Sequence, residues 1–227
     1  MEFNEYRQYV AEFIGTFALI FIGAGALAIT GNNLDGHSYA LENLLGVALA
    51  HGFVVIAFVY AYGHISGTHI NPAVTLGLLV AGEIDLVTAI GYWIVQFAGG
   101  IAAALMLKGL LPVDGDLGVT ILAENVSVTQ GLFVEIILTF FLVTTIFNTA
   151  VSGKAGNFAG IAIGLTLIAC ILMGGPLTRA SFNPARTLGP AIASGNYADL
   201  WLYFVGPCVG AVLAAFLYLG MVEDKGI

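Results

Sequence analysis

Charged residues are scarce in this sequence. Asp, Glu, Lys and Arg together make up only 9% of its 227 residues, whereas about a quarter of an average soluble domain is charged. Only six residues are Lys or Arg, and they form no cluster, so the basic surface of a nucleic-acid-binding protein is absent. Because 59% of the residues are hydrophobic, we expect an integral membrane protein that lies in the lipid bilayer and binds no nucleic acid.

Cysteine and histidine are also rare. Cys170 and Cys208 lie inside apolar stretches, where a cysteine behaves as a small core residue rather than a disulfide partner or metal ligand. His64 and His69 flank one polar loop, but their spacing is not that of the paired histidines on a metalloprotease helix. No nucleophile and base stand together in a catalytic pattern. We therefore expect neither an enzyme nor a protein that holds a metal or another cofactor.

Long apolar runs take the place of charge. Most of them have about 20 residues, the length that crosses a bilayer as an α-helix. The runs predict six transmembrane spans, at about residues 9–30, 41–63, 86–108, 128–150, 158–172 and 199–219. The first run lacks the short apolar core and cleavage site of a signal peptide, so we expect it to be retained. The chain is predicted to be a single all-α membrane domain over residues 1–227, with polar loops at 31–39 and 109–125.

The tripeptide Asn-Pro-Ala occurs twice, at residues 71–73 and 183–185. Asn is among the best N-cap residues, and Pro suits the first helical position because its missing N–H would be unpaired there. Each tripeptide therefore predicts a helix start, and the helices are expected to reach about Ala81 and Ala193. Helices this short cannot cross a bilayer, so both are predicted to be re-entrant half-helices.

The second half of the chain repeats the plan of the first. Glu12 precedes the first Asn-Pro-Ala as Glu135 precedes the second, within repeats at about 9–108 and 128–219. Three spans per repeat is an odd number, so the repeats enter the membrane from opposite sides. The two half-helices then face each other, N-terminus to N-terminus, near the midplane. Both chain termini are expected in the cytoplasm, as favoured by the basic residues predicted inside (Arg7, Lys154 and Lys225) against one outside, Lys108.

The loops before the half-helices are predicted to line a pore. Irregular backbone at membrane depth is tolerated only where protein buries it or a water-filled cavity adjoins it. Each half-helix carries a partial positive charge at its N-terminus, which repels cations. The amides of Asn71 and Asn183 can still donate hydrogen bonds to a neutral solute at the pore centre. The pore-lining carbonyls are expected from both loops, at Gly67, Thr68, His69, Arg179, Ala180 and Ser181.

Ionisable side chains inside apolar runs usually mark function. Arg186 follows the second Asn-Pro-Ala, and it either faces the pore or braces loop carbonyls. Glu12 and Glu135 are expected to accept hydrogen bonds from N–H groups of the re-entrant loops, with proton transport as the alternative. His64 is expected to support the first loop.

Two functional classes fit this architecture. One is a passive channel, and the other is an ion-coupled secondary transporter, because inverted repeats with broken helices also build transporters. A coupled transporter needs acidic residues at a central ion site. The acidic residues inside the predicted membrane region lie at the starts of spans and not beside Asn71 or Asn183. This placement favours the channel.

Four short motifs resemble those of the aquaporin (major intrinsic protein) family, and the likeness covers essentially the whole chain. The motifs are Ala11-Glu12-Phe13, Gly63-His64-Ile65-Ser66-Gly67, His69-Ile70-Asn71-Pro72-Ala73-Val74-Thr75 and Asn183-Pro184-Ala185-Arg186. The resemblance implies six spans with two half-helices and a homotetramer with one pore in each protomer. It also implies passive transport of water or small neutral solutes, with selectivity set by pore diameter, hydrogen-bond donors and electrostatic barriers.

The resemblance further implies an outer constriction. By register from the motifs, it falls on His51, Ile171, Ala180 and Arg186. Orthodox water channels place an aromatic residue at the first of these positions and His at the second, so this set is closer to plant tonoplast intrinsic proteins. A buried His51 bonded to a neighbouring helix is the alternative to a pore role. We expect water as the first substrate with ammonia, urea or glycerol in addition, and a multi-pass protein of the cell (plasma) membrane.

Overall fold

A computed structural model of the chain describes residues 5–31, 41–111 and 117–222. Within these residues, six helical stretches are long and apolar enough to cross a membrane. They are Tyr6–Thr30, Asn43–Ser66, Leu86–Leu110, Val128–Val151, Gly156–Thr178 and Leu202–Met221. The prediction of an all-α membrane protein with six spans is confirmed. Both chain ends, including Lys225, and nearly all of the predicted loop at 31–39 lie outside the described residues.

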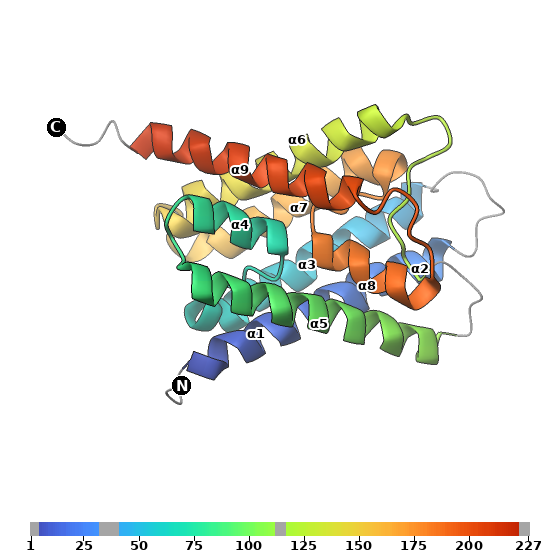
Figure 1. Ribbon diagram of the computed structural model, residues 1–227, viewed down its shortest axis with the longest axis horizontal. Coiled ribbons are helices and arrows are strands. Elements are labelled where there is room, and N and C mark those ends of the chain that lie inside the picture. The colour runs from blue at the N-terminus through green and yellow to red at the C-terminus, as the bar shows by residue number, and fades with distance from the viewer. Residues whose placement is uncertain (1–4, 32–40, 112–116, 223–227) are drawn as a thin grey trace.

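The helices follow the predicted order, and each half of the chain contains one short helix besides its spans (Figure 1). The first half consists of α1 (Glu5–Ala18), η1 (Leu19–Ala24), α2 (Gly25–Gly31), α3 (Leu41–Ser66), α4 (Pro72–Val80) and α5 (Leu86–Leu110). The second half consists of α6 (Val128–Ile146), η2 (Phe147–Val151), η3 (Gly156–Phe158), α7 (Ala159–Thr178), α8 (Pro184–Ser194) and α9 (Leu202–Val222).

The fifth span is longer than predicted. The sequence predicts that this helix ends at residue 172, because two glycines and a proline follow within the next four residues. The structure instead continues α7 through Pro176 to Thr178. The glycines serve close packing, since a Cβ on Gly175 would lie 2.6 Å from Leu44 Cδ1 of α3. Contacts with neighbouring helices therefore override the low helix propensity of this stretch.

Two spans contain a turn of π-helix, a local widening in which the backbone bonds to a residue five positions away. The turn η1 joins α1 to α2 in the first span, and η2 ends the fourth span. These are the first spans of the two repeats. Their positions do not follow from apolar periodicity, so the sequence reading did not include them. Such turns often occur at functional sites.

The two halves of the chain interlock. The half-helix α4 packs against α9 of the second half as well as α5, while α8 packs against α5 of the first half. Small residues permit this approach, as is usual between helices in membranes. A Cβ on Gly100 of α5 would lie only 2.7 Å from the Ala185 carbonyl oxygen of α8. Figure 1 shows α4 and α8 end to end in the middle of the bundle.

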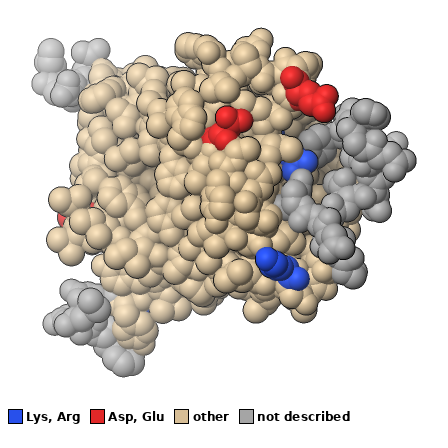
Figure 2. Space-filling model, turned by 45° about the vertical axis from the view of Figure 1, so that its right-hand side comes forward, with Lys and Arg blue, Asp and Glu red and all other residues tan. Residues whose placement is uncertain are grey.

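The outer surface is apolar. Large hydrophobic side chains lie exposed along the spans, and Val87, Phe158 and Ile94 are 76%, 70% and 64% exposed. In Figure 2 the face that is drawn is almost free of charged residues. A soluble monomer rarely exposes apolar surface on this scale, so these side chains face lipid. The chain is a multi-pass integral membrane protein.

Candidate functional site

Both half-helices begin at the predicted caps. The side-chain oxygen of Asn71 accepts a hydrogen bond from the Ala73 N–H at 2.8 Å. The side-chain oxygen of Asn183 accepts bonds from the N–H groups of Ala185 at 3.0 Å and Arg186 at 3.3 Å. Each Asn oxygen is therefore occupied by its own helix. The amide NH2 groups are not used by the caps and can act outside the helices.

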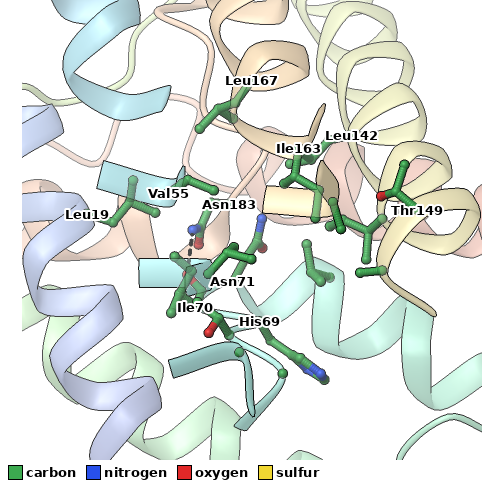
Figure 3. Close-up of a pocket in the computed structure, with 18 of the residues that line it drawn as sticks. Leu19, Val55, His69, Ile70, Asn71, Leu142, Thr149, Ile163, Leu167 and Asn183 are labelled. Carbon is green, nitrogen blue, oxygen red and sulfur yellow. Dashed lines mark hydrogen bonds between the residues drawn. The ribbon is translucent and has the colours of Figure 1, made fainter. Parts of the chain in front are cut away.

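The two Asn amides tie the two loops to each other. Asn71 Nδ2 donates to the Phe182 carbonyl at 2.7 Å, and Asn183 Nδ2 donates to the Ile70 carbonyl at 2.9 Å. Figure 3 shows the second of these bonds as a dashed line, with both Asn side chains close together. An NH2 group has two donors, and each bond uses one of them. The second donor of each amide is available to a molecule between the loops.

Glu12 of α1 bonds to the first re-entrant loop. One carboxylate oxygen accepts from the Ser66 hydroxyl and the His69 N–H, both at 2.8 Å. The other accepts from the Ile70 N–H at 2.6 Å and from Gln96 Nε2 at 2.8 Å. Glu12 is completely buried. These four donors saturate its oxygens, so the geometry supports the bracing interpretation rather than proton transport.

Glu135 of α6 does the same for the second loop. It accepts from the Thr178 hydroxyl at 2.7 Å and from the N–H groups of Ser181 at 3.0 Å and Phe182 at 2.7 Å. Ser66 and Thr178 hold corresponding places, since each hydroxyl also accepts an N–H from two residues ahead. The inverted repeat thus extends to individual hydrogen bonds. The two sites differ in that only Glu12 has a glutamine beside it.

The backbone of both loops adopts the left-handed conformation at matching positions. The φ angles are 50° at Thr68 and 43° at Ile70, and 46° at Ala180 and 38° at Phe182. Non-glycine residues rarely adopt this conformation, which costs of order 1–3 kcal/mol each. The carboxylate bonds to the loop amides offset that cost. The loops are therefore held in one preorganised shape, with Asn71 and Asn183 following directly.

A cavity of about 390 Å³ runs between the loops. His51 and Arg186 line it, as do Asn71 and Asn183 at the half-helix ends. It continues past apolar side chains labelled in Figure 3, among them Ile163 and Leu167. Gly153 and Gly156, the second of which begins η3, also line it. A path with a polar middle and mostly apolar walls suits small molecules that need few hydrogen bonds.

The cavity includes some of the predicted pore residues and not others. Of the residues whose carbonyls were expected to line the pore, the cavity is bordered by Gly67, Thr68, His69 and Ser181. Arg179 and Ala180 do not border it. Of the predicted constriction, His51 and Arg186 border it, whereas Ile171 and Ala180 are buried in the hydrophobic core. The constriction set remains a prediction.

His64 is not placed to support the loop. Because α3 continues to Ser66 rather than ending near residue 63, His64 lies in its last turn and is exposed. Among the described residues its side chain makes no hydrogen bond. Two residues that the sequence reading missed hold the loop start instead: Ser66, through Glu12, and Tyr92, whose hydroxyl donates to the Ser66 carbonyl at 2.7 Å.

Arg186 is the largest of the fully buried side chains. Its Nη1 donates to the Gly118 carbonyl at 2.6 Å, and Nη1 of Arg179 donates to the Val119 carbonyl at 2.9 Å. Both interpretations of Arg186 are compatible with this geometry, since it borders the cavity and bonds a loop carbonyl. The segment around Gly118 was missed by the sequence reading. Its only signal was a short apolar run inside a connection expected to be polar.

His51 and Arg186 both border the cavity. Its Nδ1 lies 2.9 Å from the Val47 carbonyl oxygen one turn earlier, while Nε2 has no hydrogen-bond partner among the described residues. The carbonyl acceptor requires the proton on Nδ1. A neutral ring then has Nε2 as an acceptor. The bond within α3 and the position at the cavity are compatible, so packing and pore roles are not exclusive.

Known proteins resemble this chain over nearly its whole length. The family model described as Major intrinsic protein matches residues 1–218. A probable aquaporin of TIP type from Antirrhinum majus is 43% identical over 222 residues, covering 93% of this chain and 86% of the relative. Aquaporin TIP2-1 from Arabidopsis thaliana is 40% identical over 217 residues, with the same coverage. The X-ray structure of the aquaglyceroporin from Plasmodium falciparum superimposes with a TM-score of 0.80 at 26% identity, covering 97% of this chain and 98% of that one.

The paired half-helices, the amides between them and the buried carboxylates that hold both loops are features of the whole bundle rather than of one local motif. A family model matches nearly all of the same chain, and relatives more than 30% identical share most of it. The chain therefore belongs to the major intrinsic protein family.

Proposed function

We propose that this protein is a passive channel for water and small neutral solutes, with one pore through each copy of the chain. The observation that carries the proposal is the cavity that passes between two half-helix N-termini, where Asn71 and Asn183 each keep one free amide donor. The similarity to TIP-type aquaporins and to an aquaglyceroporin supports the same function. An enzymatic role has no support from this family.

The cavity favours neutral solutes over cations. The N-termini of α4 and α8 each present about half a positive charge to it, and the Arg186 side chain adds a full one at its border. Coulomb repulsion is strong where water is sparse, because the effective dielectric constant is low. His51, Ile171, Ala180 and Arg186 are proposed as the outer constriction, of which the first and last border the cavity.

The proposed channel is a homotetramer in an internal membrane. Family resemblance supports a homotetramer, and the apolar outer surface of the spans offers room for contacts between copies as well as with lipid. The expected plasma-membrane location is not supported, because the similar relatives are TIP-type aquaporins, the tonoplast class. The location that these relatives favour is an internal membrane of that kind.

Flux measurements on purified protein in proteoliposomes test the channel. Osmotic swelling followed by stopped-flow light scattering should be faster than in empty liposomes and should follow the osmotic gradient alone. An ion-coupled transporter would instead respond to a proton or sodium gradient. Swelling no faster than in empty liposomes, or flux that requires an ion gradient, would overturn the proposal.

An Arg186→Val variant tests ion and solute exclusion. Removal of the cation that borders the cavity should admit larger neutral solutes and let protons leak, while water flux persists. A pH-sensitive dye inside the liposomes reads the proton leak. If the variant retains the parent's solute profile and proton tightness, Arg186 acts only as a brace for the Gly118 carbonyl.

A further inference from the structure

The π-helical turn η1 lies directly behind His51. Gly23, in that turn, is so close to the imidazole that an added Cβ would lie 2.5 Å from Cδ2 and Nε2 and 2.7 Å from Cε1. Real Cβ atoms are essentially never found within 3.0 Å of such neighbours. Gly23 is buried and does not border the cavity, whereas His51 does. The ring therefore stands between Gly23 and the cavity, whereas Leu19, at the other end of η1, borders the cavity directly.

The ring has little freedom to move aside. Its Nδ1 is held by the Val47 carbonyl at 2.9 Å within α3, and the side chain is only 4% exposed. A Cβ at position 23 would therefore either rotate the ring away from a preferred rotamer or break the bond to Val47. Because Gly23 lies behind the ring, displacement away from Gly23 carries the imidazole towards the cavity.

We propose that Gly23 is a positioning residue for permeation: its missing side chain, presented by the π-helical turn, sets how far the His51 ring reaches into the pore. This inference rests on the proposed channel function and extends it to a residue outside the pore lining. The π-turn matters because it places Gly23, and not a residue with a side chain, opposite the ring. Permeability is then controlled by a residue that does not itself border the cavity.

A double-mutant cycle between positions 23 and 51 tests the proposal. Gly23→Ala should lower water permeability per channel about fivefold, because a ring off its rotamer narrows the path. In a His51→Ala background no ring can be displaced, so the same change at Gly23 should have almost no effect. Gly25→Ala is the matched control. It lies two residues on, and its Cβ would meet the flexible Leu107 side chain at 3.0 Å rather than the ring.

A second readout does not depend on transport. Thermal unfolding of the purified variants should show that Gly23→Ala lowers the midpoint and that adding His51→Ala restores much of the loss. If Gly23→Ala fails to fold but the double variant folds, the conflict is with the ring and the proposal stands. The proposal is overturned if Gly23→Ala lowers the permeability or the unfolding midpoint equally in the presence and absence of His51. It is also overturned if Gly23→Ala has the same permeability and midpoint as Gly25→Ala.

The two proposals fail separately. A parent protein that conducts no water removes the channel function, whatever the thermal cycle shows about the contact. A parent that conducts water while Gly23→Ala conducts equally well leaves the channel intact and removes only the positioning role.

Discussion

Replacing one carboxylate oxygen of Glu135 by an NH2 group should lower the free energy of unfolding by an amount that can be estimated from the hydrogen bonds at this site. Glu135→Gln keeps the size of the side chain but turns one acceptor oxygen into an NH2 donor. The glutamine can keep its oxygen towards Thr178 and Ser181, which bond to the same carboxylate oxygen. Its NH2 group then faces the Phe182 N–H, which in the parent protein donates to a Glu135 oxygen at 2.7 Å. Two donors face each other in a buried site.

The expected cost is about 2 kcal/mol, because a buried donor left without an acceptor costs about 1–3 kcal/mol. The left-handed backbone at Phe182 also loses the bond that holds it, so the second loop should become less ordered. We expect lower water flux per channel together with lower stability. The corresponding change at Glu12 is less clean. The amide of Gln96 lies beside it with an unpaired oxygen, and it could turn over to accept from the new NH2 group.

Unfolding in mixed detergent and SDS micelles measures the free energy, and stopped-flow swelling of proteoliposomes measures the flux. Glu124→Gln is the control, since it removes the same charge at an exposed position whose side chain makes no hydrogen bond within the described residues. The reasoning fails if Glu135→Gln is as stable as Glu124→Gln. It also fails if stability falls by the expected amount while the flux per folded channel is unchanged, because the loop would then not need the bond.

Three further predictions concern single positions. In the parent protein, Asn71 Nδ2 donates to the Phe182 carbonyl oxygen at 2.7 Å. Asn71→Asp replaces this donor with a carboxylate oxygen, which the carbonyl oxygen repels, and places a negative charge between the helix ends. Swelling and ion-flux assays should show less water flux or a cation leak. Unchanged water flux with no cation leak would contradict a central role for Asn71. Lys108→Met removes the 2.6 Å bond to the Ala193 carbonyl at the C-terminal end of α8 and should cost about 1 kcal/mol in SDS unfolding, with water flux retained. Mercurials should not block water flux by reacting with Cys170, because this residue is buried and does not border the cavity. Rapid mercurial block that is abolished by Cys170→Ser would refute this prediction.

Much of this fold was predictable because it depends on local chemistry. Apolar runs of bilayer length predict spans, and an Asn-Pro pair predicts a capped helix start, so both half-helices were found within one residue of their expected ends. The recurrence of Glu12 and Glu135 in the same order predicted bonds to loop N–H groups, and such bonds are present at both. In each case the relevant information lies in neighbouring residues or in the comparison of one repeat with the other.

The rest depends on contacts that no local pattern encodes. Arg186 donates to a backbone carbonyl 68 residues away, and since every residue type has such a carbonyl, its position carries no sequence signal. His64 was misplaced because the end of α3 shifted by one turn, which moved that side chain to the exposed face and gave its role to Ser66. The π-turn at Gly23 and the passage of α7 through Pro176 arise from packing against other helices.

The crossed amide bonds also bear on how the protein is made. They join residues 111 and 113 positions apart, one from each half of the chain. While the second half is still being synthesised, the first re-entrant loop has an amide and a carbonyl at membrane depth without their partners, and α4 lacks its contact with α9. An unpaired polar backbone group in lipid is costly, so the first loop has little reason to stay at that depth alone. Completion of the pore must therefore await insertion of the last span, and a ribosome-released first half should expose residues 67–71 to protease that the full chain protects.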